Sequence, residues 1–286
     1  MKEILRQENL CTKSTNLVTI ESSTSKGAQP KWFDYENNIY YKKDYHGYES
    51  LAEWVVYNVL DTCTNLDKSL ILPYHLCFID DEAGCYSYDF KQGLEDAEEI
   101  TLRTMNRLNG ITDDKFMKMT LRKPIKESFS ILCDIIESVT SKRFEDELKI
   151  LFAVDAFFLN EDRHTVNLSF IRYGNGNYKL SPIFDNGMCL LSRVEAYSMI
   201  TSTRLLIDKP RARLLSPRFD KHLELYDGAP FIYKKKLHEF VDKIWNIDVP
   251  EVRRIATILE LQLSNKYTQK LFIPEEPGLT KSSIFS

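Results

Sequence analysis

The hydrophobic residues of the first 90 positions come in short runs that are separated by polar turns. Runs rich in β-branched and aromatic residues favour strands, and here they cover residues 17–20, 39–43, 71–79 and 85–90. The polar stretch 80–84 predicts a turn between the last two strands. One helix is expected from about residue 50 to residue 60. Residues 1–90 are therefore predicted to form a small lobe rich in β-structure.

After residue 91 the hydrophobic pattern changes to longer helical periods. Residues 126–139 carry apolar side chains at the spacing of one helix face. Residues 145–159 are apolar on nearly all sides, which is typical of a buried helix. Two more helices are predicted at roughly 232–245 and 250–271, whereas the long segment 192–230 is mixed in character and basic in places. This second part, residues 91–286, is predicted to be a larger helical lobe.

A β-hairpin is predicted directly after the buried helix. The segment 174–177, Gly-Asn-Gly-Asn, is a strong turn signal between apolar runs. Asp162 and Asn167 precede this hairpin, five residues apart, and Asp185 follows it. Kinases place a catalytic Asp, a metal-binding Asn and a later metal-binding Asp in this order. The three residues therefore indicate phosphotransferase chemistry.

The residue types suit that chemistry. Phosphoryl transfer depends mainly on positioning and on neutralising charge. Mg²⁺ prefers oxygen ligands, so Asn167 and Asp185 are the candidate metal ligands. Because an Asp has an ordinary pKa of about 3.9, Asp162 is expected mainly to orient the acceptor hydroxyl. An ordinary polar turn would also explain Asp162 and Asn167, but the later carboxylate favours catalysis.

Composition narrows the class of protein further. A formal net charge of -4 at pH 7 and a pI near 5.8 argue against a general nucleic-acid binder. The six cysteines include no C-x-x-C pair, which predicts a reducing compartment, no disulfides and no zinc site. No run of 18 apolar residues occurs, and the first ten residues are charged throughout. We therefore expect neither a membrane span nor a secretory signal.

Three separated blocks of the sequence resemble the HipA-like serine/threonine kinases, which include bacterial toxin kinases and the short CtkA-type kinases. The blocks are Gly27-Ala28-Gln29-Pro30-Lys31, Asn160-Glu161-Asp162-Arg163-His164 with Asn167, and Leu180-Ser181-Pro182-Ile183-Phe184-Asp185. The likeness spans about residues 20–190. It implies an α+β, two-lobed, protein-kinase-like fold with a small β-rich N-lobe (1–90) and a larger helical C-lobe (91–286).

The resemblance also implies roles for individual residues. Asp162 would be catalytic, and Asn167 and Asp185 would hold Mg²⁺. Lys43 would bind phosphate with Glu53 as its helix partner, and Lys42 is the alternative lysine. The covering loop over the ATP phosphates would include Gly27, Ala28, Gln29 and Lys31, and the adenine would lie near Tyr86, Tyr88 and Phe90.

Two further sets of residues are placed by the same likeness. Arg163 and His164 are expected to brace the catalytic loop. Family members can phosphorylate a Ser or Thr three residues before the loop glycine, and here that position is Thr24. Ser23 and Ser25 are the alternatives, although the run 22–25 would also suit a flexible tip.

Some residues depart from the family pattern or have simpler explanations. Leu159 stands where these kinases often have a glycine, the covering loop holds one glycine rather than three, and Asn186 replaces the Phe of Asp-Phe-Gly. A lysine at a strand end, such as Lys43, is often a solvated residue. Glu53 would equally fit the polar side of an amphipathic helix. The short distance from the first residue to the covering loop suggests the short form of the family.

The sequence thus predicts an ATP- and Mg²⁺-dependent kinase for Ser or Thr hydroxyls of a protein substrate, with autophosphorylation in the Gly27 loop. One alternative is a lipid or small-molecule kinase, because phosphoinositide kinases share an Asp-Arg-His-x-x-Asn loop. Another is a nucleotide-binding pseudokinase or regulatory module of a toxin–antitoxin system, with an antitoxin-like protein partner. Direct nucleic-acid binding is not expected. The bacterial cytoplasm is the expected location, with secretion to a host as the alternative.

Overall fold

The computed structural model describes residues 11–19 and 29–274. The N-terminal part is a six-stranded sheet in the order β1-β5-β6-β4-β3-β2, and all neighbours are antiparallel except β1 and β5. The strands are β1 (Cys11–Thr12), β2 (Val18–Thr19), β3 (Lys31–Asp34), β4 (Ile39–Lys43), β5 (His75–Ile79) and β6 (Glu82–Tyr88). A short 3₁₀ turn, η1 (Ser14–Asn16), lies between β1 and β2.

Most N-terminal elements lie close to their predicted positions. The strand β4 has the predicted bounds, and the predicted helix is α2 (Glu49–Cys63). The turn between β5 and β6 is made by Asp80 and Asp81, both with positive φ (51° and 64°). Two such residues fit the tight turns that match strand twist. The strand β3 was not predicted, because its first residue, Lys31, was assigned to the covering loop.

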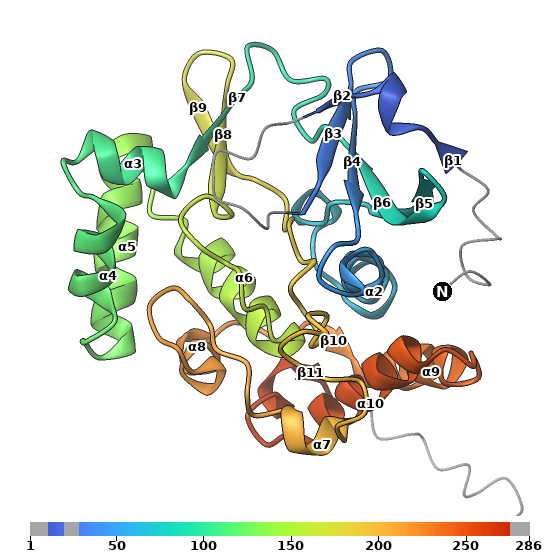
Figure 1. Ribbon diagram of the computed structural model, residues 1–286. Helices are drawn as coiled ribbons and strands as arrows, with labels where there is room; N and C mark the ends of the chain where they lie inside the picture. Colours follow the sequence, from blue (N-terminus) through green and yellow to red (C-terminus); the bar gives the residue numbers. More distant parts are fainter. Residues whose placement is uncertain (1–10, 20–28, 275–286) are drawn as a thin grey trace, which may run out of the picture.

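The helix α2 lies against one face of the sheet and touches β4, β5 and β6 (Figure 1). Its other side contacts α9. Leu51, Val55 and Val59 of α2 belong to the same hydrophobic cluster as the central helices of the C-terminal part. Burial of apolar surface is the main favourable term in folding, so this shared core holds α2 against both parts. The lobe boundary at residue 90 stays a prediction.

The C-terminal part is built around α6 (Glu145–Phe158), which packs on α8 and is nearly all buried. Apolar residues on all its sides explain this central place. The other helices are α3 (Leu102–Leu108), α4 (Asp113–Thr120), α5 (Ile125–Thr140), α7 (Thr203–Leu206), α8 (Phe219–Leu225), α9 (Lys234–Trp245) and α10 (Pro250–Ser264). Two 3₁₀ turns are η2 (Lys68–Leu70) and η3 (Gln269–Leu271). The predicted last helix ends seven residues early, before η3.

The predicted hairpin is present as β8 (Ser169–Tyr173) and β9 (Asn177–Leu180). A third strand, β7 (Glu98–Thr101), pairs with β8 and was not predicted, because two of its four residues are glutamates. A small parallel pair is formed by β10 (Ile232–Tyr233), directly before α9, and β11 (Phe272–Ile273), directly after η3. Within the described residues, no helix is long and apolar enough to span a membrane.

Candidate active site

The predicted catalytic loop begins where α6 ends. Leu159 caps this helix with φ 59°, a left-handed conformation that glycine adopts with least strain. The loop is then held by side chains: Asn160 Nδ2 donates to Asp155 Oδ1 (2.9 Å), and the Asp162 N–H donates to Asn160 Oδ1 (2.9 Å). The missing family glycine at position 159 therefore does not prevent a left-handed turn, because Leu159 adopts it.

Arg163 is buried under the loop and makes charge-assisted hydrogen bonds. Its guanidinium lies 3.0 Å from Asp155 Oδ2 and donates to the carbonyl oxygens of Asn167 (2.6 Å) and Phe184 (2.7 Å). It also donates to Asn186 Oδ1 at 3.1 Å. The planar guanidinium can satisfy several acceptors at once. Arg163 thus connects α6, the catalytic loop and the segment that carries Asp185.

Asp162 and Asn167 lie close together at the end of this loop. Asn167 Nδ2 donates to the Asp162 carbonyl oxygen at 3.0 Å, which leaves the Asn167 amide oxygen able to bind a cation. His164 Nδ1 accepts the N–H groups of Val166 and Asn167, and its Nε2 lies 3.8 Å from Asp162 Oδ2. Burial lowers the pKa of His164 despite the opposing charge of Asp162. The imidazole is therefore mainly neutral at pH 7 and acts as a loop acceptor.

Asp185 lies between two lysines. Its Oδ1 is 2.8 Å from Lys42 Nζ and 3.4 Å from Lys31 Nζ, and its backbone has φ 57°. Burial acts to raise the pKa of Asp185, but Lys31 and Lys42 outweigh it and hold the pKa well below its ordinary value. Asp185 is therefore ionised at any neutral pH, as a metal-binding carboxylate must be.

Lys42 is the lysine that faces this carboxylate. Its Nζ lies 2.7 Å from Glu53 Oε1 in α2 and 3.2 Å from the Tyr74 hydroxyl. Glu53 Oε2 also accepts the N–H of Asn186 at 2.8 Å. Burial disfavours the charge on Lys42, but Asp185 and Glu53 together raise its pKa well above the ordinary value. One buried network thus joins β4, α2 and the Asp185 segment.

The predicted ion pair between Lys43 and Glu53 is wrong. Lys43 pairs with Glu82 at the sheet surface, 2.9 Å away. Successive side chains of a strand point to opposite faces, so only one of two neighbouring lysines can face α2. The sequence named both lysines, and the tertiary structure puts Lys42 on the inner face.

The predicted adenine residues divide between the two faces of the sheet. Tyr86 packs beside Tyr41, with ring centroids 5.8 Å apart, on the face opposite Lys42, and Tyr88 lies on that same face by strand alternation. The side chains of these two tyrosines therefore point away from a nucleotide beside Lys42, which corrects the prediction that they lie near the adenine. The ring centroid of Phe90 lies 5.6 Å from that of Phe184, the residue before Asp185. Phe90 is therefore on the same side as the candidate site.

The predicted phosphate-covering loop is described only at its end. Gly27 and Ala28 lie outside the described residues, as do the candidate phosphorylation sites Ser23, Thr24 and Ser25. Gln29 is half-buried, and its Nε2 has no hydrogen-bond partner among the described residues. Lys31 follows at the start of β3 and reaches Asp185. The end of the loop thus adjoins the site.

Two arginines near Asp162, Arg211 and Arg213, were missed by the sequence analysis. Arg213 Nη2 lies 3.1 Å from Asp162 Oδ1, and Glu161 Oε1 accepts the Tyr197 hydroxyl (2.6 Å) and the Arg211 N–H (3.2 Å). The arginines come from the irregular segment 192–230, in which the sequence predicted no helix or strand. Its basic character was the only signal in the sequence, and basic character does not indicate a position.

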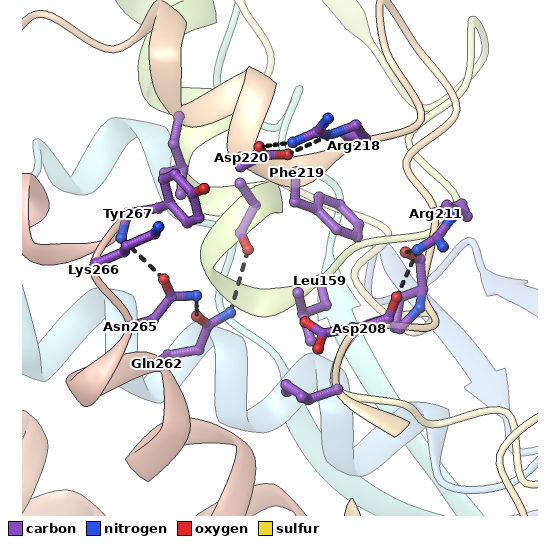
Figure 2. Close-up of a pocket in the computed structure, with 14 residues that line it drawn as sticks. Leu159, Asp208, Arg211, Arg218, Phe219, Asp220, Gln262, Asn265, Lys266 and Tyr267 are labelled. Atoms are coloured by element: carbon purple, nitrogen blue, oxygen red, sulfur yellow. Dashed lines mark hydrogen bonds and ion pairs between the residues drawn. The ribbon is translucent and has the colours of Figure 1, made fainter. Parts of the chain in front are cut away.

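A cavity of about 750 Å³ is lined by part of this segment, by the end of α6 and by residues around the end of α10. Figure 2 shows Leu159 in its centre, Arg211 and Asp208 on one side, and Lys266 and Tyr267 on the other. Leu159 directly precedes the catalytic loop, and Arg211 binds Glu161 through its backbone. The cavity therefore adjoins the predicted catalytic loop, and its other walls come from residues 207–223 and 262–267.

The donor set fits a hard cation better than a transition metal. Among the described residues, no group of three or more His, Cys, Asp and Glu side chains could hold a metal. Mg²⁺ needs only one or two protein oxygens when substrate phosphates and water complete its shell. Asn167 and Asp185 offer one amide and one carboxylate oxygen, and Lys42 and Lys31 offer positive charge for phosphates. These residues fit Mg·ATP.

Comparison with solved structures bears directly on the fold. The chain superposes on the Helicobacter pylori proinflammatory kinase CtkA with a TM-score of 0.61 and 15% identity, covering 91% of this chain and 96% of that one. The protein has a two-lobed kinase-like fold. The predicted resemblance to HipA-like kinases is thus confirmed at the level of structure, and the predicted fold class with it.

A second similar structure is HipA of Shewanella oneidensis MR-1, in a toxin–antitoxin complex with HipB and operator DNA. It shares 14% identity and a TM-score of 0.42, over 96% of this chain and 65% of that one. No protein-family profile matches the sequence, and no curated protein matches it.

Proposed function

We propose that this protein is an ATP- and Mg²⁺-dependent kinase that phosphorylates Ser or Thr hydroxyls of a protein. The observation that supports it best is the convergence of separate segments. Lys42 forms ion pairs with both Asp185 and Glu53, and Arg163 connects the segment that carries Asp185 to the loop that carries Asp162. The shared fold with a kinase is consistent with this assignment.

Each residue then has a defined task. Lys42 and Lys31 place positive charge beside the phosphates, and Glu53 keeps Lys42 in position. Asn167 and Asp185 would hold the Mg²⁺, which would offset charge on the transferring oxygens when bound. Asp162 orients the acceptor hydroxyl, and its carboxylate accepts the proton late in transfer. Arg163 fixes the loop that carries Asp162 and Asn167.

The test is transfer of labelled phosphate. Purified protein is incubated with Mg·ATP, a generic protein substrate and, separately, lipid vesicles, and products are identified by mass spectrometry. We expect phosphoserine or phosphothreonine on protein, including Thr24 or a neighbour. Labelling of lipid alone would support a lipid kinase, and nucleotide binding without turnover would support a pseudokinase. A residue-specific control is Asp162→Gln, which is expected to bind nucleotide without transfer.

A further inference from the structure

The irregular segment after Asp185 brings two arginines to the predicted catalytic loop, and a third, Arg193, accepts the Tyr197 N–H through its carbonyl oxygen (2.8 Å). Arg213 pairs with Asp162, and the Arg211 N–H binds Glu161. Burial and Glu161 raise the pKa of the neighbouring Tyr197, while the charges of Arg193 and Arg211 oppose that rise. These three arginines, Arg193, Arg211 and Arg213, are called the arginine cluster below.

Few carboxylates balance this cluster. In the described part of the chain, no carboxylate forms an ion pair with the side chain of Arg193 or Arg211. The Arg211 guanidinium donates instead to the carbonyl oxygens of Asp208 and Pro210. Glu161 is already bonded to Tyr197 and to the Arg211 backbone. A positive surface therefore adjoins the carboxylate that meets the acceptor, although the whole chain is acidic.

Other charges nearby do not cancel it. Glu195 is largely exposed and lies 3.5 Å from His46, and Asp220 in the cavity wall is held by Arg218. Asp208 lines the same cavity, and Lys266 faces it across the cavity (Figure 2). Arg103, on the other flank of the loop, is paired with Asp113 at 2.8 Å. The charge left for a ligand is therefore that of the arginine cluster.

We propose that the arginine cluster selects acceptor sequences with an acidic residue within about three positions of the phosphorylated Ser or Thr, a reach of roughly 10 Å in an extended peptide. This inference rests on the proposed kinase function, because it assigns the place of the hydroxyl to Asp162. An acidic side chain takes the Arg213 guanidinium and frees the Asp162 carboxylate for the hydroxyl. The adjoining cavity receives a further part of the acceptor.

The geometry of Arg213 suits such an exchange. Its side chain is 53% exposed, and ion pairs with that exposure are weak and readily replaced. A guanidinium binds carboxylates in a planar, bidentate way that a lysine does not reproduce. Rim charges of this kind also steer oppositely charged partners during encounter. Arg213 would thus stay paired with Asp162 until an acidic side chain of the acceptor replaces the Asp162 carboxylate as its partner.

The experiment compares three Ser-containing peptides that differ only in flanking residues, which are Glu, Ala or Lys. Binding is measured by fluorescence anisotropy with a non-hydrolysable ATP analogue, and transfer is measured with Mg·ATP. We expect the Glu peptide to exceed the Ala peptide about tenfold in affinity and in kcat/KM.

Arg211→Gln and Arg213→Gln should each reduce the ratio between the Glu and Ala peptides to about threefold or less by losing one charge-assisted contact. The double variant Arg211→Glu with Arg213→Glu should favour the Lys peptide. Circular dichroism verifies that each variant is folded.

The matched control is Arg172→Gln, an exposed arginine paired with Glu98 on β8, which should keep the full ratio. Equal binding of all three peptides, or a ratio unchanged in the arginine-cluster variants, would overturn the inference. So would displacement of the Glu peptide by a single-stranded oligonucleotide at a lower concentration, which would indicate a nucleic-acid surface. Acid-selective binding without any transfer would support the inference while contradicting the proposed kinase activity.

Discussion

Two groups of charges meet at the candidate site, and they are built differently. Lys42 and Glu53 are buried on a strand and a helix, Asp185 is partly buried in the segment after β9, and Lys42 Nζ lies within 2.8 Å of both carboxylates. Asp162 and Arg213 are partly exposed, and Arg213 comes from an irregular segment. Removing one member of a buried pair leaves a charge without a partner, whereas an exposed pair is solvated either way. The first group is suited to rigid positioning and the second to exchange with a ligand.

The largest expected effect lies in the exposed group and is catalytic. Asp162→Asn keeps the side-chain shape but removes the carboxylate that we propose orients the acceptor hydroxyl. We expect transfer to fall by roughly 10² to 10⁴-fold, the usual contribution of a general base. Nucleotide affinity, measured by titration calorimetry, should stay nearly unchanged because Lys42 and Asp185 are intact.

The control for this variant is Asp61→Asn, which removes an exposed carboxylate of α2 that pairs with Lys68. Its transfer rate should equal that of the original protein. Full activity of Asp162→Asn would contradict the role given to the loop and would leave the two groups of charges without a functional difference.

The buried group should dominate stability. Lys42→Met leaves Glu53 and Asp185 without their shared cation, and we expect a loss of about 3–5 kcal/mol in the free energy of unfolding. Lys43→Met removes only the surface pair with Glu82, which is worth about 1 kcal/mol or less. Urea denaturation of the two variants measures the difference. Equal losses for these adjacent lysines would show that the buried network does not stabilise the fold.

The stability of the fold is expected to depend on pH through Asp44, which lies in the connection between β4 and α2. Asp44 accepts the N–H of Ser50 (2.6 Å), and burial raises the pKa of Asp44 to about 7. Because the folded state holds this proton more tightly, stability is full below the ordinary pKa of about 3.9 and falls as pH rises toward 7. Asp44→Asn should flatten the decline between about pH 5 and pH 7.5 in chemical denaturation. An unchanged slope would contradict this assignment.

Asp185 contributes in the opposite direction. Its folded pKa lies below the ordinary value, so its stabilisation is present above about pH 4 and is lost as pH falls further. A measurement below about pH 4 therefore reports on the buried group, and one between about pH 5 and pH 7.5 reports on Asp44. The two windows separate these contributions.

The smallest stability effect is expected at Arg213. Arg213→Gln removes an ion pair whose cation is half exposed, so we expect a change of about 1 kcal/mol or less in the free energy of unfolding. The thermal midpoint, followed by circular dichroism, should move by a few degrees at most. A large loss would mean that Arg213 is a structural residue and would weaken the contrast between the two groups.

Much of the architecture was predictable because local patterns agree with it. The bounds of β4, the buried character of α6 and the hairpin β8–β9 follow from strand runs, apolar surfaces on all sides and a turn signal. The strand β7 was not predictable from its own residues, since its two adjacent glutamates, both exposed, hide its pairing with β8. Strand pairing between distant segments carries little local signal.

For the candidate site, the sequence by itself indicated the chemistry that we propose: Asp162, Asn167 and Asp185 stand at the intervals at which kinases place such side chains. Only the tertiary structure decided which lysine serves it, since Lys42 and Lys43 are chemically alike and only their faces on β4 differ. It also decided that Arg213 meets Asp162. That contact joins residues 51 positions apart through an irregular segment, and no local preference encodes where such a segment will fold back.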